Sequence, residues 1–282
     1  MTSDEADAEF RDWMRDNLTR AAKHFGVTVS GQPVFGWLDR SISVAVRKGG
    51  ADRWLRVVSE DPKWVHLDFW KGNRDSNNII DIPKPIVLAS FEWDEHRRQR
   101  AELMTRLPGR PCSSTDVLRT DIPLSSQWWS QLRRALSVLS RTPTGRVNVD
   151  QNKVDQRVHA AFGEHVNIKV EQWETAHGDL HWGNLFRPRL GIVDWEHWGR
   201  APAGTDAATL YCYSLLAPST ARALHDVFAD VLDSPAGQVA QLYVIARLSH
   251  RARRGEHPDL VEPLANHARS LLGDPGQPMP GP

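Results

Sequence analysis

The residues of this chain that are best suited to chemistry lie in two short segments. Residues 177–186 read HGDLHWGNLF, and residues 191–196 read GIVDWE. The first segment places Asp179 and Asn184 between apolar runs that have the pattern of strands. Burying such a polar group without a partner costs on the order of 2 kcal/mol or more, so the segment is poor core material. We therefore expect these side chains to hold a ligand.

Two glycines decide how this segment is built. Gly178 and Gly183 disfavour a helix, because glycine loses more backbone freedom on folding than any other residue. A loop between two strands is the better interpretation, and such a loop can turn Asp179 and Asn184 toward one point. His177 is expected to fix this loop by hydrogen bonding rather than to react.

A metal-hydrolase site is an alternative interpretation of the same residues. His177 and His181 lie four positions apart, and Asp179 and Asp194 would complete a set of zinc ligands. Zinc ligands at this spacing need a helix, and the glycines and the polar context argue against one. We therefore prefer the loop, with His181 in a structural role.

The spacing of apolar residues predicts a β-rich first part of the chain. Apolar residues three or four positions apart indicate a helix, and alternating apolar residues indicate a strand. These two patterns predict a helix over residues 8–25, a hairpin within 33–60, a helix over 64–80, and strands within 82–93 and 100–107.

The pattern changes at Pro108, Gly109 and Pro111, which indicate a connection between domains. We place the domain boundary there, with a first domain over residues 1–107 and a second over 108–272. Helical spacing then predicts helices within residues 125–140, 150–162, 205–216, 221–232, 237–254 and 260–272. The tail, residues 273–282, is expected to be disordered because it is rich in proline and glycine.

The order H-x-D-x-x-x-x-N, followed by Asp194, resembles the aminoglycoside phosphotransferase (choline kinase-like) family. This resemblance implies an α+β, bilobal, protein kinase-like fold with a small antiparallel β-rich N-lobe and a larger, mainly helical C-lobe, between which the nucleotide lies. It also implies an ATP- or GTP-dependent O-phosphotransferase that acts on a hydroxyl group of a small molecule. Protein kinases carry Arg where Gly178 stands and D-F-G where this chain has Asp194-Trp195-Glu196, so the small-molecule branch is the closer match.

The resemblance also assigns roles in the second domain. Asp179 accepts or orients the proton of the substrate hydroxyl, and Asn184 and Asp194 coordinate the Mg²⁺ that bridges the phosphates. Phosphoryl transfer needs such positioning and countercharge more than covalent chemistry. His177 and Asp206 are assigned structural roles at the site, the latter as the anchor of the helix that follows.

The nucleotide contacts implied by the resemblance lie in the first domain. Arg56 stands where the family has the strand Lys that pairs with the nucleotide phosphates. Met104 would lie behind the adenine, with the C=O of Thr105 and the N–H of Leu107 offered to its edge. Ser41 and Ser43 belong to the stretch that resembles the loop over the phosphates, although G-x-G-x-x-G is missing.

One feature departs from the family. The first-domain helix should supply a Glu to pair with the strand cation, but residues 64–78 contain none. Asp68 is the nearest substitute and Asp75 the next. This departure motivates an alternative of another class, a nucleotide-binding pseudokinase with a regulatory role, whereas Asp179, Asn184 and Asp194 together favour an active kinase.

Composition sets the remaining expectations. The formal net charge is zero, which favours neither a nucleic-acid nor a membrane partner. The N-terminal segment lacks the pattern of a signal peptide, so a cytoplasmic location is expected. A monomer or dimer is expected as the oligomeric state. Cys112 and Cys212 lie far apart and predict no disulfide framework. From residue 201 onward acids and bases roughly balance, so a sugar, an amino alcohol or a nucleoside fits as substrate as well as an antibiotic.

Overall fold

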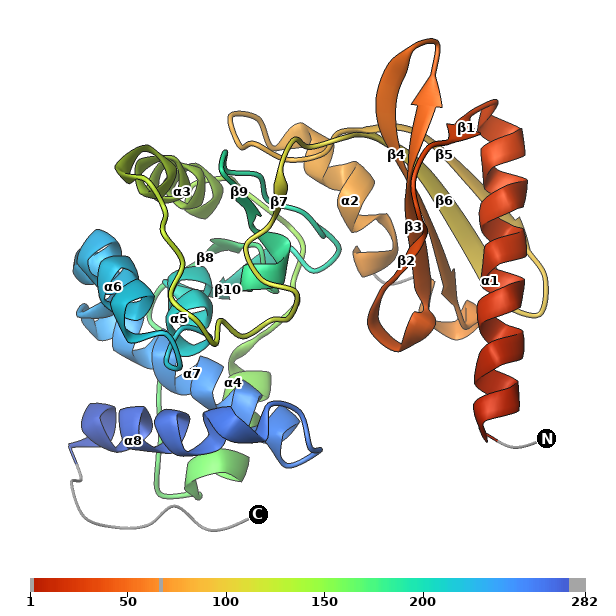
Figure 1. Cartoon of the computed structure of the whole chain (residues 1–282). Coiled ribbons are helices and arrows are strands. Elements are labelled where there is room, and N and C mark those ends of the chain that lie inside the picture. The colour runs from red at the N-terminus through yellow and green to blue at the C-terminus, as the bar shows by residue number, and fades with distance from the viewer. Residues whose placement is uncertain (1–2, 66–67, 274–282) are drawn as a thin grey trace. The chain divides into compact units, whose positions relative to one another are not determined.

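The computed structural model of this protein describes residues 3–65 and 68–273 and shows two compact units (Figure 1). The first unit comprises Met1–Asn78 and Lys84–Leu107, and the second comprises Ile79–Pro83 and Pro108–Pro282. The chain passes finally from one unit to the other after Leu107, where proline and glycine follow. The expected disordered tail lies, except for Gly273, outside the described residues.

The first unit is an antiparallel sheet with a long helix on one face (Figure 1). The strand order is β1-β3-β4-β6-β5, with β2 paired to β3. Its elements are α1 (Ser3–Phe25), β1 (Thr28–Val29), β2 (Val34–Phe35), β3 (Ser41–Lys48), β4 (Ala51–Glu60), α2 (Gly72–Asp75), β5 (Val87–Asp94) and β6 (Arg98–Thr105). The predicted first helix, the hairpin and the two later strands are therefore confirmed.

Alternation along the strands gives this sheet two different faces, because successive side chains of a strand point to opposite sides. One face is apolar and packs against Met14, Leu18 and Phe25 of α1. The buried strand residues of this core are Ile42, Val44, Val46, Leu55, Val57, Trp93, Ala101 and Leu103. The other face, called the polar face below, also carries polar and charged side chains, and Ser41, Ser43, Arg56 and Met104, which the sequence assigned to the nucleotide, lie on it.

The helix predicted over residues 64–80 is wrong in extent. The described part of this range contains the 3-10 turns Asp68–Lys71 and Ser76–Asn78, with only α2 between them. Gly72 opens α2, and Ser76, Asn77 and Asn78 follow it directly. Glycine and short polar side chains oppose a regular helix, the latter because they compete for backbone hydrogen bonds: Ser76 Oγ donates to the carbonyl of Asn73 at 2.7 Å.

The second unit is mainly helical, as its sequence patterns predicted. Its elements are β7 (Arg110–Pro111), α3 (Ser126–Ser140), α4 (Gln151–Phe162), β8 (Trp173–Ala176), β9 (Phe186–Arg187), β10 (Gly199–Pro202), α5 (Thr205–Cys212), α6 (Pro218–Leu232), α7 (Pro235–Ala252) and α8 (Val261–Leu272). Side-chain caps define where three of these helices begin, because Ser125, Asp150 and Ser234 each accept a backbone N–H from the first turn.

Helix α5 lies at the centre of this unit and contacts both α6 and α7 (Figure 1). All eight residues of α5 except Tyr211 are buried, so the helix forms part of the core of this unit. Cys112 and Cys212 are free and buried. No helix within residues 3–65 and 68–273 is both long enough and apolar enough to cross a membrane.

Candidate active site

The segment that carries Asp179 follows strand β8, which pairs antiparallel with β10. Gly178 has a φ of 81°, a left-handed conformation that side chains other than glycine rarely adopt. A Cβ at this position would also overlap the backbone oxygen of His197. The loop predicted from Gly178 is thus present, and its conformation requires the glycine.

Asp206 holds the start of this loop from helix α5. Its Oδ2 accepts the backbone N–H of His177 at 2.7 Å, and its Oδ1 accepts that of Gly178 at 3.2 Å. Burial raises the pKa of the Asp206 carboxyl to about 7, while the two N–H donors act in the opposite direction. The next carbonyl along the loop, that of Gly178, accepts a hydrogen bond from Arg247 of α7 at 2.8 Å.

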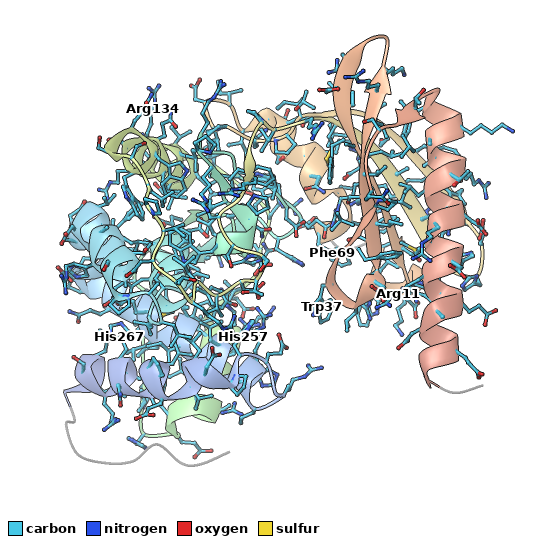
Figure 2. All side chains as sticks on the ribbon, in the orientation of Figure 1. Arg11, Trp37, Phe69, Arg134, His257 and His267 are labelled. Atoms are coloured by element: carbon cyan, nitrogen blue, oxygen red, sulfur yellow. The ribbon has the colours of Figure 1, made fainter. Side chains whose placement is uncertain are left out.

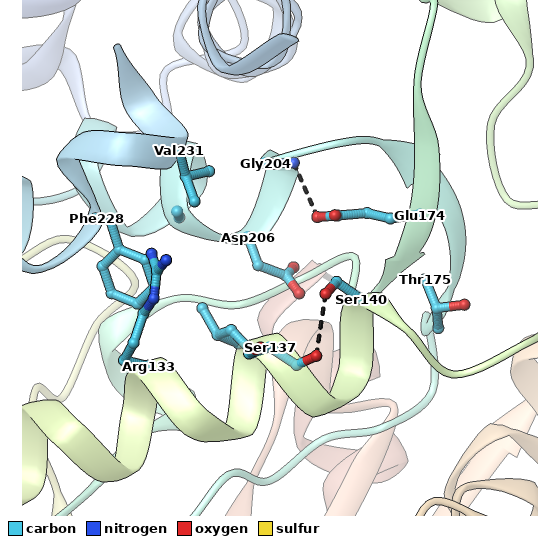
Figure 3. A pocket seen from close by; sticks show the side chains of 11 residues that line it. Arg133, Ser137, Ser140, Glu174, Thr175, Gly204, Asp206, Phe228 and Val231 are labelled. Carbon is cyan, nitrogen blue, oxygen red and sulfur yellow. Dashed lines mark hydrogen bonds between the residues drawn. The ribbon is translucent and has the colours of Figure 1, made fainter. Parts of the chain in front are cut away.

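Behind Asp206 lies a small cavity of the second unit, about 110 Å³ in volume (Figure 3). Glu174 lines it together with Asp206 and accepts the backbone N–H of Gly204 at 2.8 Å. Burial raises the pKa of Glu174 as well. The cavity is therefore lined by the same Asp206 carboxylate that binds the backbone of the loop before Asp179.

His177 joins the loop to the segment that carries Asp194. Its side chain is fully buried, and Nε2 donates to the carbonyl of Val193 at 3.0 Å. The ring packs edge-on against Trp195, with the ring centroids 4.8 Å apart. Burial lowers the pKa of the His177 imidazole to about 4, so the ring is neutral near pH 7. This geometry fits a residue that fixes the loop.

Asn184 connects the loop that carries Asp179 to the segment that carries Asp194. Its Nδ2 donates to the carbonyl of Asp179 at 3.0 Å, and its own carbonyl accepts the N–H of Val193 at 3.0 Å. Asp194 comes next along the chain and has a φ of 65°. This left-handed conformation is uncommon for residues other than glycine, and aspartate is one of the few that adopt it. Asp179, Asn184 and Asp194 therefore belong to one hydrogen-bonded backbone arrangement.

The neighbours of His181 argue against the zinc interpretation. The residue lies between β8 and a 3-10 turn, Trp182–Asn184, so it shares no helix with His177. Its Nδ1 accepts the N–H of Gly183 at 3.2 Å, which leaves the proton on Nε2. Nε2 lies 3.6 Å from Asp116 Oδ1 and 3.8 Å from Asp179 Oδ2. His181 thus faces two carboxylates through an N–H and is not arranged as a metal ligand.

Asp116 is a residue of this region that sequence reasoning missed. Its Oδ2 accepts a hydrogen bond from Arg251 at 2.8 Å and lies 3.5 Å from His257 Nε2. Burial raises the pKa of the Asp116 carboxyl, but His181, Arg251 and His257 outweigh it, so the net pKa lies below its usual value. Asp116 and Arg251 are 135 positions apart in the sequence, and no local pattern indicates their pairing.

The residues assigned to the nucleotide lie in the first unit. Ser43 of β3 and Arg56 of β4 are cross-strand partners, and Met104 of β6 faces Trp54, two residues before Arg56. Cross-strand partners point to the same side of a sheet. Ser41, Ser43, Arg56 and Met104 therefore share the polar face, whereas Thr105 ends β6 and Leu107 ends the unit.

The turn between β2 and β3 adjoins these serines. Leu38 and Asp39 both have positive φ values, 50° and 56°, and Arg11 of α1 binds the Asp39 carboxylate at 2.6 Å. Trp37 at the same turn is largely exposed, with Arg11 nearby (Figure 2). The turn thus holds a strained conformation that an ion pair from α1 supports.

The structure shows which α2 residue faces the sheet. Asp68 is exposed, and Asp75 lies 3.9 Å from its neighbour Arg74. Asn73 is buried instead, and its Nδ2 donates to Glu102 Oε2 of β6 at 3.0 Å. The sequence patterns indicated neither Asn73 nor Glu102, because the two residues pair across 29 positions.

No protein-family model and no curated protein matches this sequence. Solved structures do match. Aminoglycoside phosphotransferase APH(4)-Ia is 12% identical, with a TM-score of 0.64 over 92% of this chain and 98% of that chain. The chain has the fold of this phosphotransferase.

Two further structures of this fold contain bound nucleotide and a small molecule. Spectinomycin phosphotransferase APH(9)-Ia, in complex with ADP and spectinomycin, is 12% identical, with a TM-score of 0.56 over 92% of both chains. Amicoumacin kinase hAmiN, in complex with AMP-PNP, Ca²⁺ and Ami, is 14% identical, with a TM-score of 0.53 over 96% of both chains. The predicted bilobal, protein kinase-like α+β fold is confirmed.

Proposed function

We propose that this chain is an ATP- or GTP-dependent O-phosphotransferase of the aminoglycoside phosphotransferase family that phosphorylates a hydroxyl group of a small molecule. The observation that carries the proposal is the linkage of Asp179, Asn184 and the residue before Asp194 through one side-chain and one backbone hydrogen bond of Asn184. A base and two oxygen ligands, fixed relative to one another, are what phosphoryl transfer requires of a protein. The fold shared with known phosphotransferases supports the same proposal.

In the proposed reaction the substrate hydroxyl oxygen attacks the γ-phosphorus of the nucleotide. The bond from this phosphorus to the bridging oxygen breaks, and the nucleoside diphosphate leaves with the electron pair. The hydroxyl proton passes to the Asp179 carboxylate. His181 Nε2 lies 3.8 Å from Asp179 Oδ2, beyond hydrogen-bond distance, so its N–H adds only a weak electrostatic attraction to the Asp179 carboxylate.

The donor atoms of Asn184 and Asp194 fit a Mg²⁺ ion. The Asn184 nitrogen is engaged by the carbonyl of Asp179, so Oδ1 is the amide atom left as a ligand. Carboxylate and amide oxygens are the side-chain ligands that Mg²⁺ prefers. When bound with the nucleotide, the ion would neutralise phosphate charge. Arg56, Ser41 and Ser43 are proposed to bind the phosphates, and Met104, Thr105 and Leu107 the base.

The neighbours of Asp179 bear on the substrate. Asp116 already pairs with Arg251, and Glu256 accepts from Arg251 at 2.7 Å, so these carboxylates are engaged by protein cations. A polycationic substrate needs carboxylates that can pair with it. We therefore propose a neutral or weakly charged hydroxylated substrate, which includes less cationic antibiotics, sugars and nucleosides.

Turnover with Mg²⁺ and ATP or GTP, measured against a panel of hydroxylated antibiotics and metabolites, tests the proposal. The expected result is release of nucleoside diphosphate together with a product that has gained one phosphoryl group. Asp179→Asn is the control for contaminating kinases, and it should lower both signals by roughly 100-fold or more. Tight nucleotide binding without turnover on any acceptor would favour the pseudokinase, and failure to bind nucleotide would reject both functions.

A further inference from the structure

The imidazole of His181 lies beside two carboxylates of the second unit without a hydrogen bond to either. Its Nε2 is 3.6 Å from Asp116 Oδ1 and 3.8 Å from Asp179 Oδ2, which is too long for an N–H···O bond. The ring is fixed from its other side, because Nδ1 accepts the N–H of Gly183. Within the described residues, the Nε2–H donor and the two facing oxygens therefore keep their capacity to bind a hydroxyl group, which can both accept and donate.

Arg251 fixes the Asp116 carboxylate through one of its two oxygens. Nη2 of Arg251 donates to Asp116 Oδ2 at 2.8 Å, whereas within residues 3–65 and 68–273 no hydrogen bond reaches Oδ1. The other nitrogens of Arg251 are engaged elsewhere: Nη1 donates to the hydroxyl of Tyr213 and Nε to Glu256, both at 2.7 Å. Asp116 therefore has a fixed direction and one oxygen that can accept a hydrogen bond.

The charge of Asp116 is balanced within the protein. Arg251 forms an ion pair with its Oδ2, and His257 Nε2 lies 3.5 Å from the same oxygen. An ammonium group of a ligand pairs best with a carboxylate whose charge is not already compensated, whereas a neutral hydroxyl needs only an acceptor oxygen. These neighbours therefore favour an uncharged donor at Asp116 Oδ1.

Asp116 and Asp179 are both accessible from solvent and lie close together. Their side chains are 22% and 35% exposed. Because both carboxylates lie near the same nitrogen, Asp116 Oδ1 and Asp179 Oδ2 are no more than about 7.4 Å apart. Two hydroxyl oxygens on neighbouring carbons, about 3 Å apart, with a hydrogen bond of about 2.7 Å at each end, reach over this distance. A single acceptor molecule can therefore bind both carboxylates through adjacent hydroxyls.

We propose that Asp116 binds a second hydroxyl of the acceptor, so that the substrate carries two hydroxyls on neighbouring carbons and is phosphorylated at one of them. The reacting hydroxyl faces Asp179, the neighbouring hydroxyl donates to Asp116 Oδ1, and the N–H of His181 donates to one of the two hydroxyl oxygens. This inference rests on the proposed function, because it requires Asp179 to accept the proton of the reacting hydroxyl. It narrows the substrate class to vicinal diols, which include many sugars and the ribonucleosides.

The test compares acceptors with analogues that lack one hydroxyl, for example adenosine with 2′-deoxyadenosine and glucose with 2-deoxyglucose. For the best acceptor of the panel, NMR of the product identifies the phosphorylated hydroxyl, and the matched analogue lacks its neighbour. In the wild type, loss of this neighbour should lower kcat/KM about 30-fold, the effect of losing one hydrogen bond to a charged group. In Asp116→Ala the same comparison should give about 3-fold or less, because the hydroxyl has lost its acceptor.

A purely structural role of Asp116 predicts another result, in which both acceptors of the pair lose activity by the same factor and the discrimination between them is kept. Asp259→Asn is the matched control, because Asp259 accepts a hydrogen bond at 2.7 Å from Arg119, three residues after Asp116. It should leave the discrimination at the wild-type value. The KM for ATP should be unchanged in both variants.

If Asp116→Ala does not fold, as judged by circular dichroism, the wild-type comparison decides alone. Equal rates for the pair, discrimination that persists in Asp116→Ala, or an acceptor whose phosphorylated hydroxyl has no neighbouring hydroxyl would overturn the inference while the proposed function stands. If no acceptor of the panel is phosphorylated, the proposed function fails and the inference with it.

Discussion

The side-chain nitrogen of Asn184 donates a hydrogen bond to the backbone carbonyl of Asp179 across 3.0 Å. One side chain therefore links the residue proposed as the base to the residue proposed as a metal ligand. The backbone carbonyl of Asn184 also accepts the N–H of Val193, the residue before Asp194, so Asn184 is linked by hydrogen bonds to both neighbouring segments.

Asn184→Ala should raise the Mg²⁺ concentration needed for half-maximal turnover by about 10-fold or more, because it removes an oxygen ligand and the bond to Asp179. The measurement is a Mg²⁺ titration of activity at saturating nucleotide. Asn152→Ala, an exposed asparagine on α4, is the control and should leave the titration unchanged. An unaltered Mg²⁺ requirement in Asn184→Ala would remove Asn184 from the metal site.

Gly178→Ala should destabilise the protein by about 1–3 kcal/mol and suppress activity, because the residue has a φ of 81° and a Cβ would overlap the His197 carbonyl. Urea unfolding gives the stability and steady-state kinetics the activity. Gly145→Ala is the matched control: a Cβ there meets no atom within 4 Å, so a change within about 0.5 kcal/mol is expected. Equal behaviour of the two variants would contradict the loop geometry.

Asp206→Ala should cost about 2–4 kcal/mol of unfolding free energy, because it leaves the buried N–H groups of His177 and Gly178 without their acceptor. Denaturant unfolding monitored by tryptophan fluorescence measures the cost. Asp226→Ala, an exposed acid on α6, should be nearly neutral. A neutral Asp206→Ala would mean that the loop does not depend on α5.

The pH dependence of stability tests the burial of His177. Burial lowers the pKa of the imidazole from 6.5 to about 4, so between these values the unfolded chain binds a proton that the folded chain excludes. This contribution to stability is complete above pH 6.5 and is lost as the pH falls toward 4, by up to about 3 kcal/mol.

The comparison is made between the wild type and His177→Gln, because the raised pKa of Asp206 gives a dependence of opposite sign in an overlapping range. In the wild type, stability should fall more steeply from pH 6.5 to 4 than in His177→Gln. Parallel curves would show that His177 is accessible to protons in the folded state.

Local patterns were sufficient to predict much of the fold. Ile42, Val44 and Val46 alternate because every second side chain of β3 enters the core, and Gly178 indicated a loop because glycine disfavours a helix. The helix over residues 64–80 was overpredicted, since tryptophans and leucine at helical spacing outweighed Gly72 in the pattern.

Long-range pairs were beyond such reasoning. Glu102 meets Asn73 across 29 positions, and Asp116 meets Arg251 across 135. Each carboxylate looks like an ordinary strand or loop residue until the sheet or the helices bring its partner close. The resemblance to a kinase family implied an acid on a helix, whereas Glu102, a fully buried acid of the sheet, lies on β6.

The most direct test of the central claim is the turnover number of Asp179→Asn at saturating Mg²⁺-nucleotide and acceptor. The substitution keeps the size of the side chain and removes its capacity to accept a proton. We predict a fall in kcat of roughly 100-fold or more, the range for loss of a general base, with nucleotide affinity nearly unchanged. Wild-type kcat in Asp179→Asn would contradict the proposal that this residue, and the loop built around it, transfers the phosphoryl group.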